Sequence, residues 1–288
     1  MHSIQPSIAL AGGVELPRVG LGTFKTGGAE LRAAVNAALA CGIRHIDTAA
    51  IYKNEDEIAK ALWDEARVPR SSVFITSKIS PYQMGAGKAR QAAEEIMQRL
   101  RVDCVDLLLI HWPGASGVAA TSPRNAELRL ETWRVLEDLH AEGKARAIGV
   151  SNFEATHLRQ LLAAARVRPA ANQFEVHPRR PAAALRALCA AEGVAAVAYA
   201  SLGCGALLSE PAVAAVAAEA GRTPAQVLLR WALQEGCAVI PKSITPARVA
   251  EFAPEQLLGG WGLTIDQMGK LAALEDGHKF CWDPADIM

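Results

Sequence analysis

Residues Val105–Trp112 read Val-Asp-Leu-Leu-Leu-Ile-His-Trp, an apolar run that ends in a histidine and a tryptophan. Such a run, lying between segments of helical period, is typical of a strand buried on both faces of a parallel sheet. Eight strand–helix units of this kind in one chain of 288 residues favour an α/β fold, the closed (β/α)8 TIM barrel, over an open doubly wound sheet. The other seven predicted strands are Val19–Thr23, Arg44–Thr48, Val73–Lys78, Ala145–Ser151, Ala170–Val176, Val194–Ala200 and Cys237–Lys242.

Two segments flank the predicted barrel. Ile8–Leu10 and Val14–Leu16 are two short runs separated by Gly12-Gly13, which predicts a short N-terminal β-hairpin. Gly259–Met288 follows the last strand–helix unit and is expected to form a C-terminal extension. Because no low-complexity linker interrupts the chain, we expect a single domain over residues 1–288.

Glycine patterns for nucleotide loops are incomplete. Gly20-Leu-Gly22 stands at the first strand, but Lys25 occupies the third glycine position of a dinucleotide-binding fingerprint. Gly87-Lys88 is followed by Ala89 instead of the serine or threonine that a phosphate loop needs. The sequence therefore gives no support to an open nucleotide-binding sheet or to nucleotide hydrolysis.

Three helix starts can be predicted from capping residues. Asn54 with Glu57 predicts a capping box, in which the two side chains bind backbone amides at the start of a helix. Thr223-Pro224 and Thr245-Pro246 each place a capping residue before a proline at the first helical position.

The composition limits the classes of partner. The 30 acidic and 30 basic side chains give a formal net charge of zero, so no electrostatic footprint for nucleic acid or an anionic membrane is present. The six cysteines form no Cys-x-x-Cys pair and most lie in apolar surroundings, which indicates reduced core residues in a cytoplasmic protein. Neither a signal peptide nor an apolar stretch of about 18 residues is evident, so we expect a soluble, unprocessed chain. We predict a small-molecule partner, no obligate protein partner and no metal site.

Polar side chains stand at the carboxyl ends of seven consecutive predicted strands, the end at which barrel active sites lie. Taken alone, Asp47 could cap a turn, Lys78 could be solvated, and His111 could be an ordinary loop histidine. Their joint occurrence, with the phenol of Tyr52 close to Asp47 in sequence, favours a shared site that gives a proton to a carbonyl oxygen, as in an oxidoreductase. The strand-end residues are Asp47, Lys78, His111, Ser151 with Asn152, Gln173, Tyr199, and Lys242 with Ser243.

Several motifs occur in a fixed order along the chain. They are Gly20-Leu-Gly-Thr23, His45-Ile-Asp-Thr-Ala49 followed by Tyr52, Ser77-Lys78, Ile110-His-Trp-Pro113, Ile148-Gly-Val-Ser-Asn-Phe153, Asn172-Gln173, and Ile240-Pro-Lys-Ser243. In this set and order the chain resembles the aldo-keto reductase superfamily over nearly its whole length. The segment after Gly259 is the weakest part of the resemblance.

The resemblance implies roles for four residues. Tyr52 would be the general acid that protonates the carbonyl oxygen while a hydride arrives from a reduced nicotinamide. Lys78 would stabilise the developing phenolate, and Asp47 would keep Lys78 charged and oriented. A neutral His111 would donate a hydrogen bond to the same oxygen.

The resemblance also implies NADPH as the cofactor. Lys242, Ser243 and Arg248 lie around the start of the last predicted helix, and two cations with a hydroxyl suit a 2′-phosphate better than a bare ribose. Glu251 matches a position near the adenine, with a lesser role. The remaining residues expected on the cofactor side are Ser151, Asn152 and Gln173 at the carboxamide, Tyr199 stacked on the nicotinamide ring, and Thr23 and Leu202.

The expected substrate pocket is mostly apolar, with Phe24, Ile51, Ser80 and Trp112 in its lining. Ser80 stands where many relatives have a tryptophan, which predicts a wider pocket on that side. Two further departures, Ala200 for a pyrophosphate-binding serine and Phe252 for an adenine-contacting asparagine, predict weaker cofactor affinity.

Two other functions are consistent with parts of the pattern. One is a barrel that binds NADPH as a sensor or structural subunit without turnover. The other is a lyase that uses Lys78 as a Schiff-base amine, which would require a depressed lysine pKa. Because Asp47 as a partner would raise that pKa, the lyase reading is disfavoured.

Overall fold

The computed structural model describes residues 4–288, and within them the eight predicted strands form one parallel sheet in the order β10-β9-β8-β7-β6-β5-β4-β3. A parallel bridge between Val19 and Val239 joins the two edges, and the N–H of Gly22 donates to the carbonyl of Pro241 at 2.9 Å. The sheet is therefore closed, and the predicted TIM barrel is confirmed. The strands are β3 Gly20–Gly22, β4 His45–Asp47, β5 Phe74–Ile79, β6 Val105–Ile110, β7 Ala145–Ser151, β8 Ala171–Glu175, β9 Ala195–Tyr199 and β10 Ala238–Val239.

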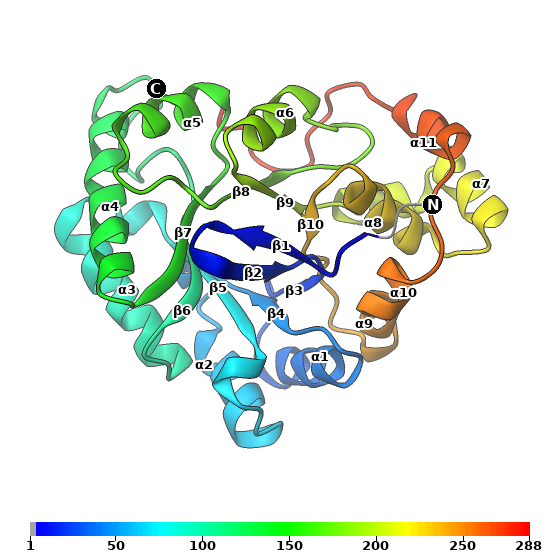
Figure 1. Cartoon of the computed structure of the whole chain (residues 1–288), viewed down its shortest axis with the longest axis horizontal. Helices are drawn as coiled ribbons and strands as arrows, with labels where there is room; N and C mark the ends of the chain where they lie inside the picture. Colours follow the sequence, from blue (N-terminus) through cyan, green and yellow to red (C-terminus); the bar gives the residue numbers. More distant parts are fainter. Residues whose placement is uncertain (1–3) are drawn as a thin grey trace.

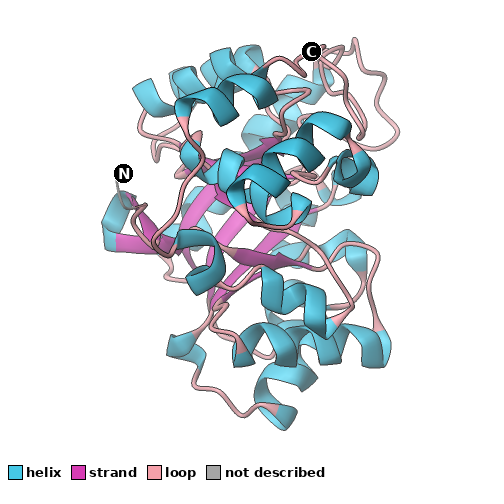
Figure 2. Ribbon diagram, turned by 90° about the vertical axis from the view of Figure 1, so that its right-hand side faces the viewer, coloured by secondary structure: helices cyan, strands magenta, loops and turns pink. Residues whose placement is uncertain are grey.

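Helices surround the strands on the outside of the barrel, as Figures 1 and 2 show. Short 3-10 turns at Ala50–Tyr52, Pro81–Gln83 and Gly203–Ser209 follow β4, β5 and β9. The α-helices are α1 Gly28–Ala40, α2 Glu55–Ala59, α3 Ala86–Leu100, α4 Arg124–Ala141, α5 Ala155–Ala164, α6 Ala183–Ala191, α7 Pro211–Ala220, α8 Pro224–Gln234, α9 Pro246–Glu251, α10 Pro254–Leu258 and α11 Ile265–Ala272.

The strands have an apolar core on each face. On β6, Leu108 and Ile110 belong to the cluster between strands and helices, which includes Trp133 of α4. Leu107 and Leu109 belong to the cluster inside the barrel. Because side chains alternate across a strand, a continuous apolar run contributes side chains to both clusters. Each fully buried leucine stabilises the folded state by about 1.5–3 kcal/mol. This is the physical reason that the apolar runs predicted the strands.

The predicted hairpin closes one end of the barrel. β1 Ser7–Leu10 and β2 Val14–Pro17 pair antiparallel, and the chain turns through Gly12 and Gly13, both at positive φ. Leu10, Val14 and Leu16 are buried in the cluster inside the barrel, and the hairpin lies across the barrel in Figure 1. Residues at the starts of the strands share this cluster, so the hairpin covers the amino ends and leaves the carboxyl ends to the site.

The predicted capping box of Asn54 and Glu57 is wrong. The Asn54 side chain caps nothing in α2. It donates to the carbonyls of Thr23 at 2.8 Å and Thr26 at 3.0 Å, and accepts from the Thr48 hydroxyl at 2.8 Å. Asn54 is buried between the loops after β3 and β4, so its amide satisfies buried polar groups that come close only in the folded chain.

The two threonine–proline helix starts differ in their capping. Thr223 begins α8 with a full capping box, because its hydroxyl accepts from the N–H of Gln226 and the Gln226 side chain accepts from the N–H of Thr223, both at 3.2 Å. Thr245 precedes α9, but its side chain makes no capping bond. The expectation that this is the last helix is wrong, since α10 and α11 follow.

All six cysteines are free, but their surroundings differ. Cys189 and Cys237 are buried as predicted, whereas Cys204 is exposed and the other three are half-buried. The prediction of reduced core cysteines therefore holds for two of them.

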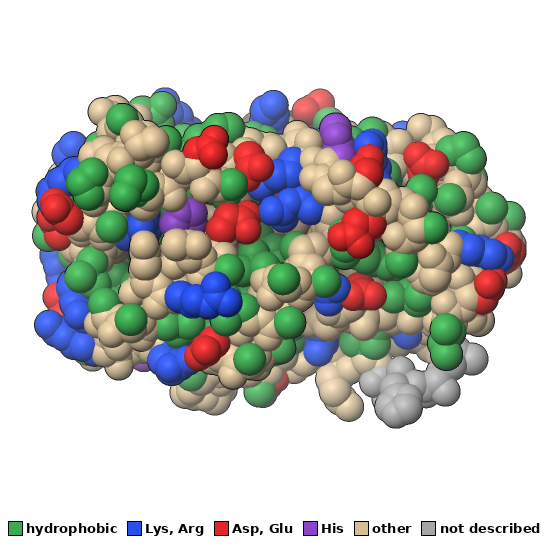
Figure 3. Space-filling view, turned by 90° about the horizontal axis from the view of Figure 1, so that it is seen from above, with side chains coloured by type: hydrophobic (Ala, Val, Ile, Leu, Met, Phe, Trp, Pro, Cys, Tyr) green, Lys and Arg blue, Asp and Glu red, His purple; other side chains and the backbone are tan. Residues whose placement is uncertain are grey.

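The surface mixes both charge signs. On the face seen in Figure 3, acidic and basic side chains are interspersed with apolar ones. Within residues 4–288, no helix is both long and apolar enough to cross a membrane, and no three or more His, Cys, Asp and Glu side chains come together in a way that could hold a metal ion.

Candidate active site

A buried ion pair lies at the carboxyl ends of β4 and β5. The Lys78 ammonium is 2.6 Å from Oδ1 of Asp47 and 2.8 Å from the carbonyl oxygen of Thr48, and both charged side chains are almost fully buried. Burial by itself lowers the pKa of Lys78, but Asp47 and Tyr52 raise it, and the result is a pKa above the usual value. Lys78 is therefore a cation at neutral pH, as the ion-pair argument predicted.

Tyr52 lies beside this pair, at the end of the 3-10 turn that follows β4. The Lys78 Nζ is 5.2 Å from the centroid of the Tyr52 ring. Burial raises the pKa of Tyr52, and the charge of Lys78 opposes that rise. The phenol therefore keeps its proton at neutral pH and lies next to a cation that would stabilise its anion.

His111 completes the group from the end of β6. Its ring meets the Tyr52 ring edge to face, with centroids 5.6 Å apart. Burial, and then the charge of Lys78, hold the pKa of His111 well below its usual value, so the imidazole is neutral at pH 7. The buried Nδ1 has no hydrogen-bond partner among the described residues. The geometry thus brings the four predicted catalytic residues together.

Polar side chains at the ends of β7, β8 and β9 form a connected patch next to this group. Gln173 donates to Oδ2 of Asp47 at 2.7 Å, which ties the patch to the ion pair. Asn152, at a φ of 63°, donates to the hydroxyl of Ser151 and accepts from the Tyr199 hydroxyl at 2.5 Å. The four residues are buried or half-buried, and their side chains lie together beside the ion pair.

Two further predicted cofactor residues occupy different environments. Thr23 is fully buried, and its hydroxyl donates to the carbonyl of Asp47 at 2.9 Å. Leu202 is half-buried just before the Gly203–Ser209 turn. Its neighbour Ser201 was not predicted, although its buried hydroxyl has no partner among the described residues. The signal was present in the sequence, because Ser201 follows Ala200, the position where the resemblance led us to expect a serine.

The segment after β10 carries the predicted phosphate-binding residues. Lys242 and Arg248 are exposed, and Ser243 is buried with its hydroxyl accepting from the N–H of Thr245 at 3.1 Å. Glu251 accepts from the Thr223 hydroxyl at 2.9 Å, so its carboxylate is engaged at the start of α8. Phe252 is buried in the core, which explains why an apolar residue is stable there.

The predicted substrate-side residues fall into two groups. Phe24 and Ile51 are exposed and Trp112 is half-buried, and the Phe24 ring lies 5.1 Å from the Tyr52 ring. Ser80 is buried, and its hydroxyl accepts from the N–H of Tyr82 to cap the Pro81–Gln83 turn. The Ser80 side chain is thus engaged in capping the turn that follows it. That the pocket is wider on this side stays a prediction.

The sequence alone left open whether Phe280, Cys281 and Trp282 line the pocket or pack against the side of the barrel. The Trp282 ring lies 4.7 Å from the Trp112 ring, and the backbone N–H groups of Phe280 and Cys281 donate to Glu175. The sequence gives no signal for these contacts, because Glu175 and Trp112 are far from the C-terminal residues along the chain.

Comparison with known proteins shows the family of the chain. The model of the aldo/keto reductase family matches residues 18–254. The chain belongs to the aldo/keto reductase family. It is similar to the glyoxal reductase of Bacillus subtilis (strain 168), with 39% identity over 99% of each chain. Members of this family are oxidoreductases that act on aldehydes and ketones with NADPH, and the protein is such an oxidoreductase.

Solved structures of this family share the fold. An aldo-keto reductase from a Medee basin deep-sea metagenome library matches with a TM-score of 0.88 and 35% identity, covering 96% of this chain and 98% of that one. A second aldo-keto reductase, solved in complex with NADPH, matches with a TM-score of 0.86 and 31% identity, covering 98% and 91%. The aldo/keto reductase barrel thus accounts for nearly the whole chain.

Proposed function

We propose that this aldo/keto reductase reduces aldehydes and ketones with NADPH, and that Tyr52 is the general acid. The observation that carries the proposal is the buried Asp47–Lys78 pair beside a protonated Tyr52. NADPH would supply the hydride to the carbonyl carbon. Tyr52 gives its proton to the carbonyl oxygen, while Lys78 stabilises the phenolate that this transfer creates.

His111 orients the substrate in this proposal. A neutral imidazole donates a hydrogen bond to the carbonyl oxygen without competing with Tyr52 as an acid. The low pKa of His111 supports this role, because burial and the neighbouring Lys78 keep the ring uncharged. Charge that develops on the oxygen is then shared between two donors.

The cofactor would bind along the ends of β7, β8 and β9 and reach the segment after β10. Ser151, Asn152 and Gln173 offer the amide and hydroxyl atoms that a nicotinamide carboxamide needs, and Tyr199 would stack on the ring. The hydroxyl of Tyr199 now binds the Asn152 side chain, so this bond would exchange for one to the carboxamide. The remaining contacts would come from Thr23, Ser201 and Leu202 near the pyrophosphate, and from Lys242, Ser243 and Arg248 at the 2′-phosphate.

The decisive assay is NADPH consumption with aromatic, aliphatic and dicarbonyl substrates, run in parallel with NADH. We include dicarbonyls because a relative is named glyoxal reductase. We expect oxidation of NADPH that requires the carbonyl compound. Tight NADPH binding without consumption would instead favour the sensor or structural role.

Tyr52→Phe should lower turnover by roughly 10²- to 10⁴-fold, the usual contribution of a general acid, and leave NADPH binding nearly unchanged. Tyr82→Phe is the matched control, because this tyrosine is exposed at 67%. Single-turnover kinetics and cofactor fluorescence titration measure the two effects. Retained turnover in Tyr52→Phe would assign the proton to another group.

The Schiff-base lyase reading is opposed by the charge state of Lys78. A nucleophilic amine must be neutral, whereas Asp47 and Tyr52 raise the pKa of Lys78. Borohydride trapping with a carbonyl substrate should therefore leave Lys78 unmodified.

A further inference from the structure

Two cysteines that the proposed chemistry does not use lie next to each other. The side chains of Cys204 and Cys281 are within hydrogen-bonding reach, although the two residues are far apart in the sequence. Cys204 is exposed and Cys281 is half-buried, so the pair lies at the surface. Two free thiols in contact can be oxidised to a disulfide if the backbones that carry them are close enough.

The two backbones do approach each other closely at this point. Gly203 and Phe280 come immediately before the two cysteines, and a Cβ at Gly203 would lie 2.8 Å from Cε2 of the Phe280 ring. The lack of a side chain at Gly203 therefore lets the loop after β9, residues 200–209, pack against the C-terminal tail, residues 276–288. This contact brings Cys204 and Cys281 together independently of their thiols.

Cys204 has a backbone conformation that its residue type disfavours. It lies in the left-handed region at a φ of 53°, between Gly203 at 59° and Gly205 at 98°. Glycine adopts this conformation without strain, and both neighbours of Cys204 are glycines. The cysteine at the middle position is thus a strained exception, and such exceptions are typical of functional sites.

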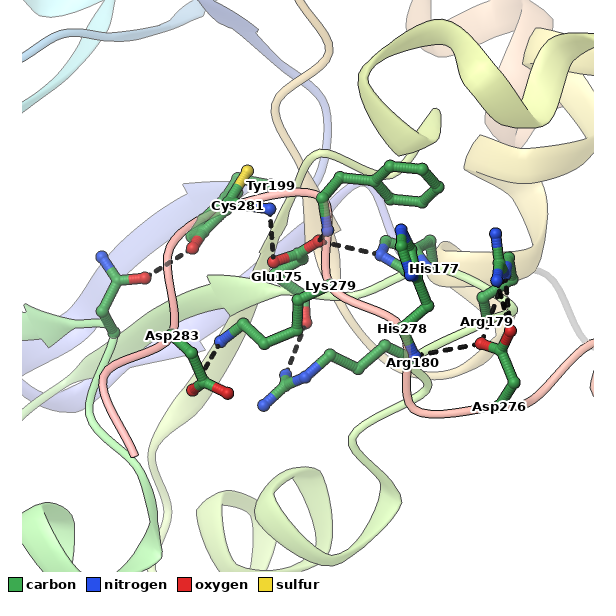
Figure 4. A network of polar contacts seen from close by, with 12 residues as sticks. Glu175, His177, Arg179, Arg180, Tyr199, Asp276, His278, Lys279, Cys281 and Asp283 are labelled. Atoms are coloured by element: carbon green, nitrogen blue, oxygen red, sulfur yellow. Dashed lines mark hydrogen bonds and ion pairs between the residues drawn. The ribbon is translucent and has the colours of Figure 1, made fainter. Parts of the chain in front are cut away.

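The Cys281 half of the pair is held by a buried carboxylate. Glu175, at the end of β8, is 1% exposed and accepts from the backbone N–H groups of Phe280 at 2.6 Å and Cys281 at 3.3 Å. Figure 4 shows Cys281 next to Glu175. A bond between the two sulfur atoms would therefore join the loop after β9 to a segment that is already attached to the barrel.

The other four cysteines, all within the described residues, do not offer an equivalent pair. Cys189 lies near enough to Cys237 to raise its pKa, but both side chains are buried away from an oxidant in solution. Cys41 and Cys104 are half-buried, and each thiol donates to a backbone carbonyl. Contact and access to solvent are thus combined at Cys204 and Cys281.

We propose that Cys204 and Cys281 form a disulfide when a peroxide is present, and that this bond ties the loop after β9 to the tail and slows the exchange of NADPH. The effect on exchange rests on the function proposed above, in which Ser201 and Leu202 of the same loop contact the pyrophosphate. The modification is reversible, because a small thiol reduces the bond and returns both cysteines to the free state.

The oxidation has two steps. In the first, the Cys204 sulfur bonds to one oxygen of hydrogen peroxide, the O–O bond breaks, and a sulfenic acid and one water form. In the second, the Cys281 sulfur attacks the Cys204 sulfur, the S–O bond breaks, and the Cys281 proton leaves with the hydroxide as a second water. Burial raises the pKa of Cys281 to about 12, so the exposed Cys204 is the thiol that meets the oxidant first.

The first test treats the full chain with hydrogen peroxide. We expect thiol titration to show the loss of two of the six thiols, and peptide mapping without reductant to find the Cys204 and Cys281 peptides joined. Dithiothreitol should restore both thiols. Cys204→Ser and Cys281→Ser should each fail to form the cross-link, whereas Cys104→Ser, the matched control, should form it as the wild type does.

The second test measures the cofactor without turnover. The oxidised protein is loaded with NADPH after the peroxide is removed, and dissociation is followed by stopped-flow fluorescence. We expect NADPH to leave the oxidised wild type at least about tenfold more slowly than the reduced one, while peroxide leaves the rate for Cys204→Ser unchanged. If the wild type bound NADPH but reduced no carbonyl compound, the proposed function would fail and the disulfide would still be tested.

Three results would overturn the inference. Oxidation of Cys204 to a sulfinic acid with Cys281 left free would show that the two sulfur atoms do not meet. A covalent dimer through Cys204 on a non-reducing gel would assign this thiol to a second molecule. Equal NADPH dissociation rates for the oxidised and reduced wild type would show that the bond does not restrain the cofactor loop.

Discussion

Lys78 is the single residue on which the candidate chemistry most depends. Its ammonium is fully buried, and a buried charge is stable only with a close partner and further hydrogen bonds. Asp47 supplies the partner and the carbonyl of Thr48 supplies a further acceptor. The same pair therefore serves stability and function, and a change to it should affect both.

Asp47→Asn tests this link, because it removes the negative charge while keeping the shape. Lys78 would lose the interaction that offsets its burial, its pKa would fall, and the phenolate of Tyr52 would lose its neighbouring cation. We expect a loss of unfolding free energy of about 3 kcal/mol and a turnover at least roughly tenfold lower. Denaturant unfolding and NADPH kinetics measure the two effects.

Asp103→Asn provides the comparison, since this carboxylate is exposed and the chemical change is identical. Equal stability of the two variants would mean that the buried pair contributes nothing measurable.

At the level of elements, short strands place the site residues through contacts with their neighbours. β4 has only three residues, and it begins with the buried His45, whose Nε2 lies 2.9 Å from the hydroxyl of Thr76 on β5. On the other side, Gly20 of β3 approaches so closely that a Cβ there would lie 2.6 Å from Nδ1 of His45. His45 thus links three strands and fixes the position of Asp47 two residues later.

His45 should make stability depend on pH. Burial lowers its pKa to about 4, whereas the unfolded chain binds the proton near 6.5. Because the folded pKa is the lower one, the unfolded state takes up the proton first, and stability is lost as pH falls below about 6.5. Between pH 7 and pH 5 we expect His45 to account for a loss of about 2 kcal/mol.

Denaturant unfolding at the two pH values, for the wild type and for His45→Gln, isolates this contribution. The variant keeps the other histidines, so the difference between the two pH slopes belongs to His45. Identical slopes would show that His45 is protonated equally in both states.

At the scale of the whole molecule, closure of the barrel brings the first and last strands together. The bridge between Val19 and Val239 places the segment after β10 next to β3, and so on the same rim as the ends of β7, β8 and β9. A long ligand can then contact residues as distant in sequence as Ser151 and Arg248. Binding of this kind stabilises the folded barrel by mass action.

NADPH should therefore raise the melting temperature of the wild type more than NADH does. At one hundred times its Kd, a ligand adds about 2.7 kcal/mol, or roughly 5 °C for a chain of this size. In the double variant Lys242→Ala, Arg248→Ala, the NADPH shift should fall to that of NADH, because the 2′-phosphate loses its cations. An unchanged preference for NADPH would place the phosphate site elsewhere.

Most of the barrel could be predicted from the sequence because its signals are local. Apolar runs such as Val105–Ile110 must be buried on both faces, and eight of them in alternation with helices leave few architectures. The polar residues at the strand ends followed from the same pattern, which is why Asp47, Lys78 and His111 could be named together with Tyr52. The charge states of Lys78 and His111 depend on their burial and on neighbouring charges, which the folded structure supplies.

Contacts between distant segments were decided by the tertiary structure alone. Asn54 has the sequence of a helix cap, but in the folded chain its side chain is buried and bonded to the carbonyls of Thr23 and Thr26. Likewise, the hydrophobic pattern of the sequence does not reveal that Glu175 binds the backbone N–H of Phe280 or that Trp282 packs on Trp112. The sequence by itself determined the barrel and the chemical group at its rim, because both depend on local burial patterns. Only the folded chain decided what covers that rim, because hydrogen bonds between residues remote in sequence leave no local pattern in the sequence.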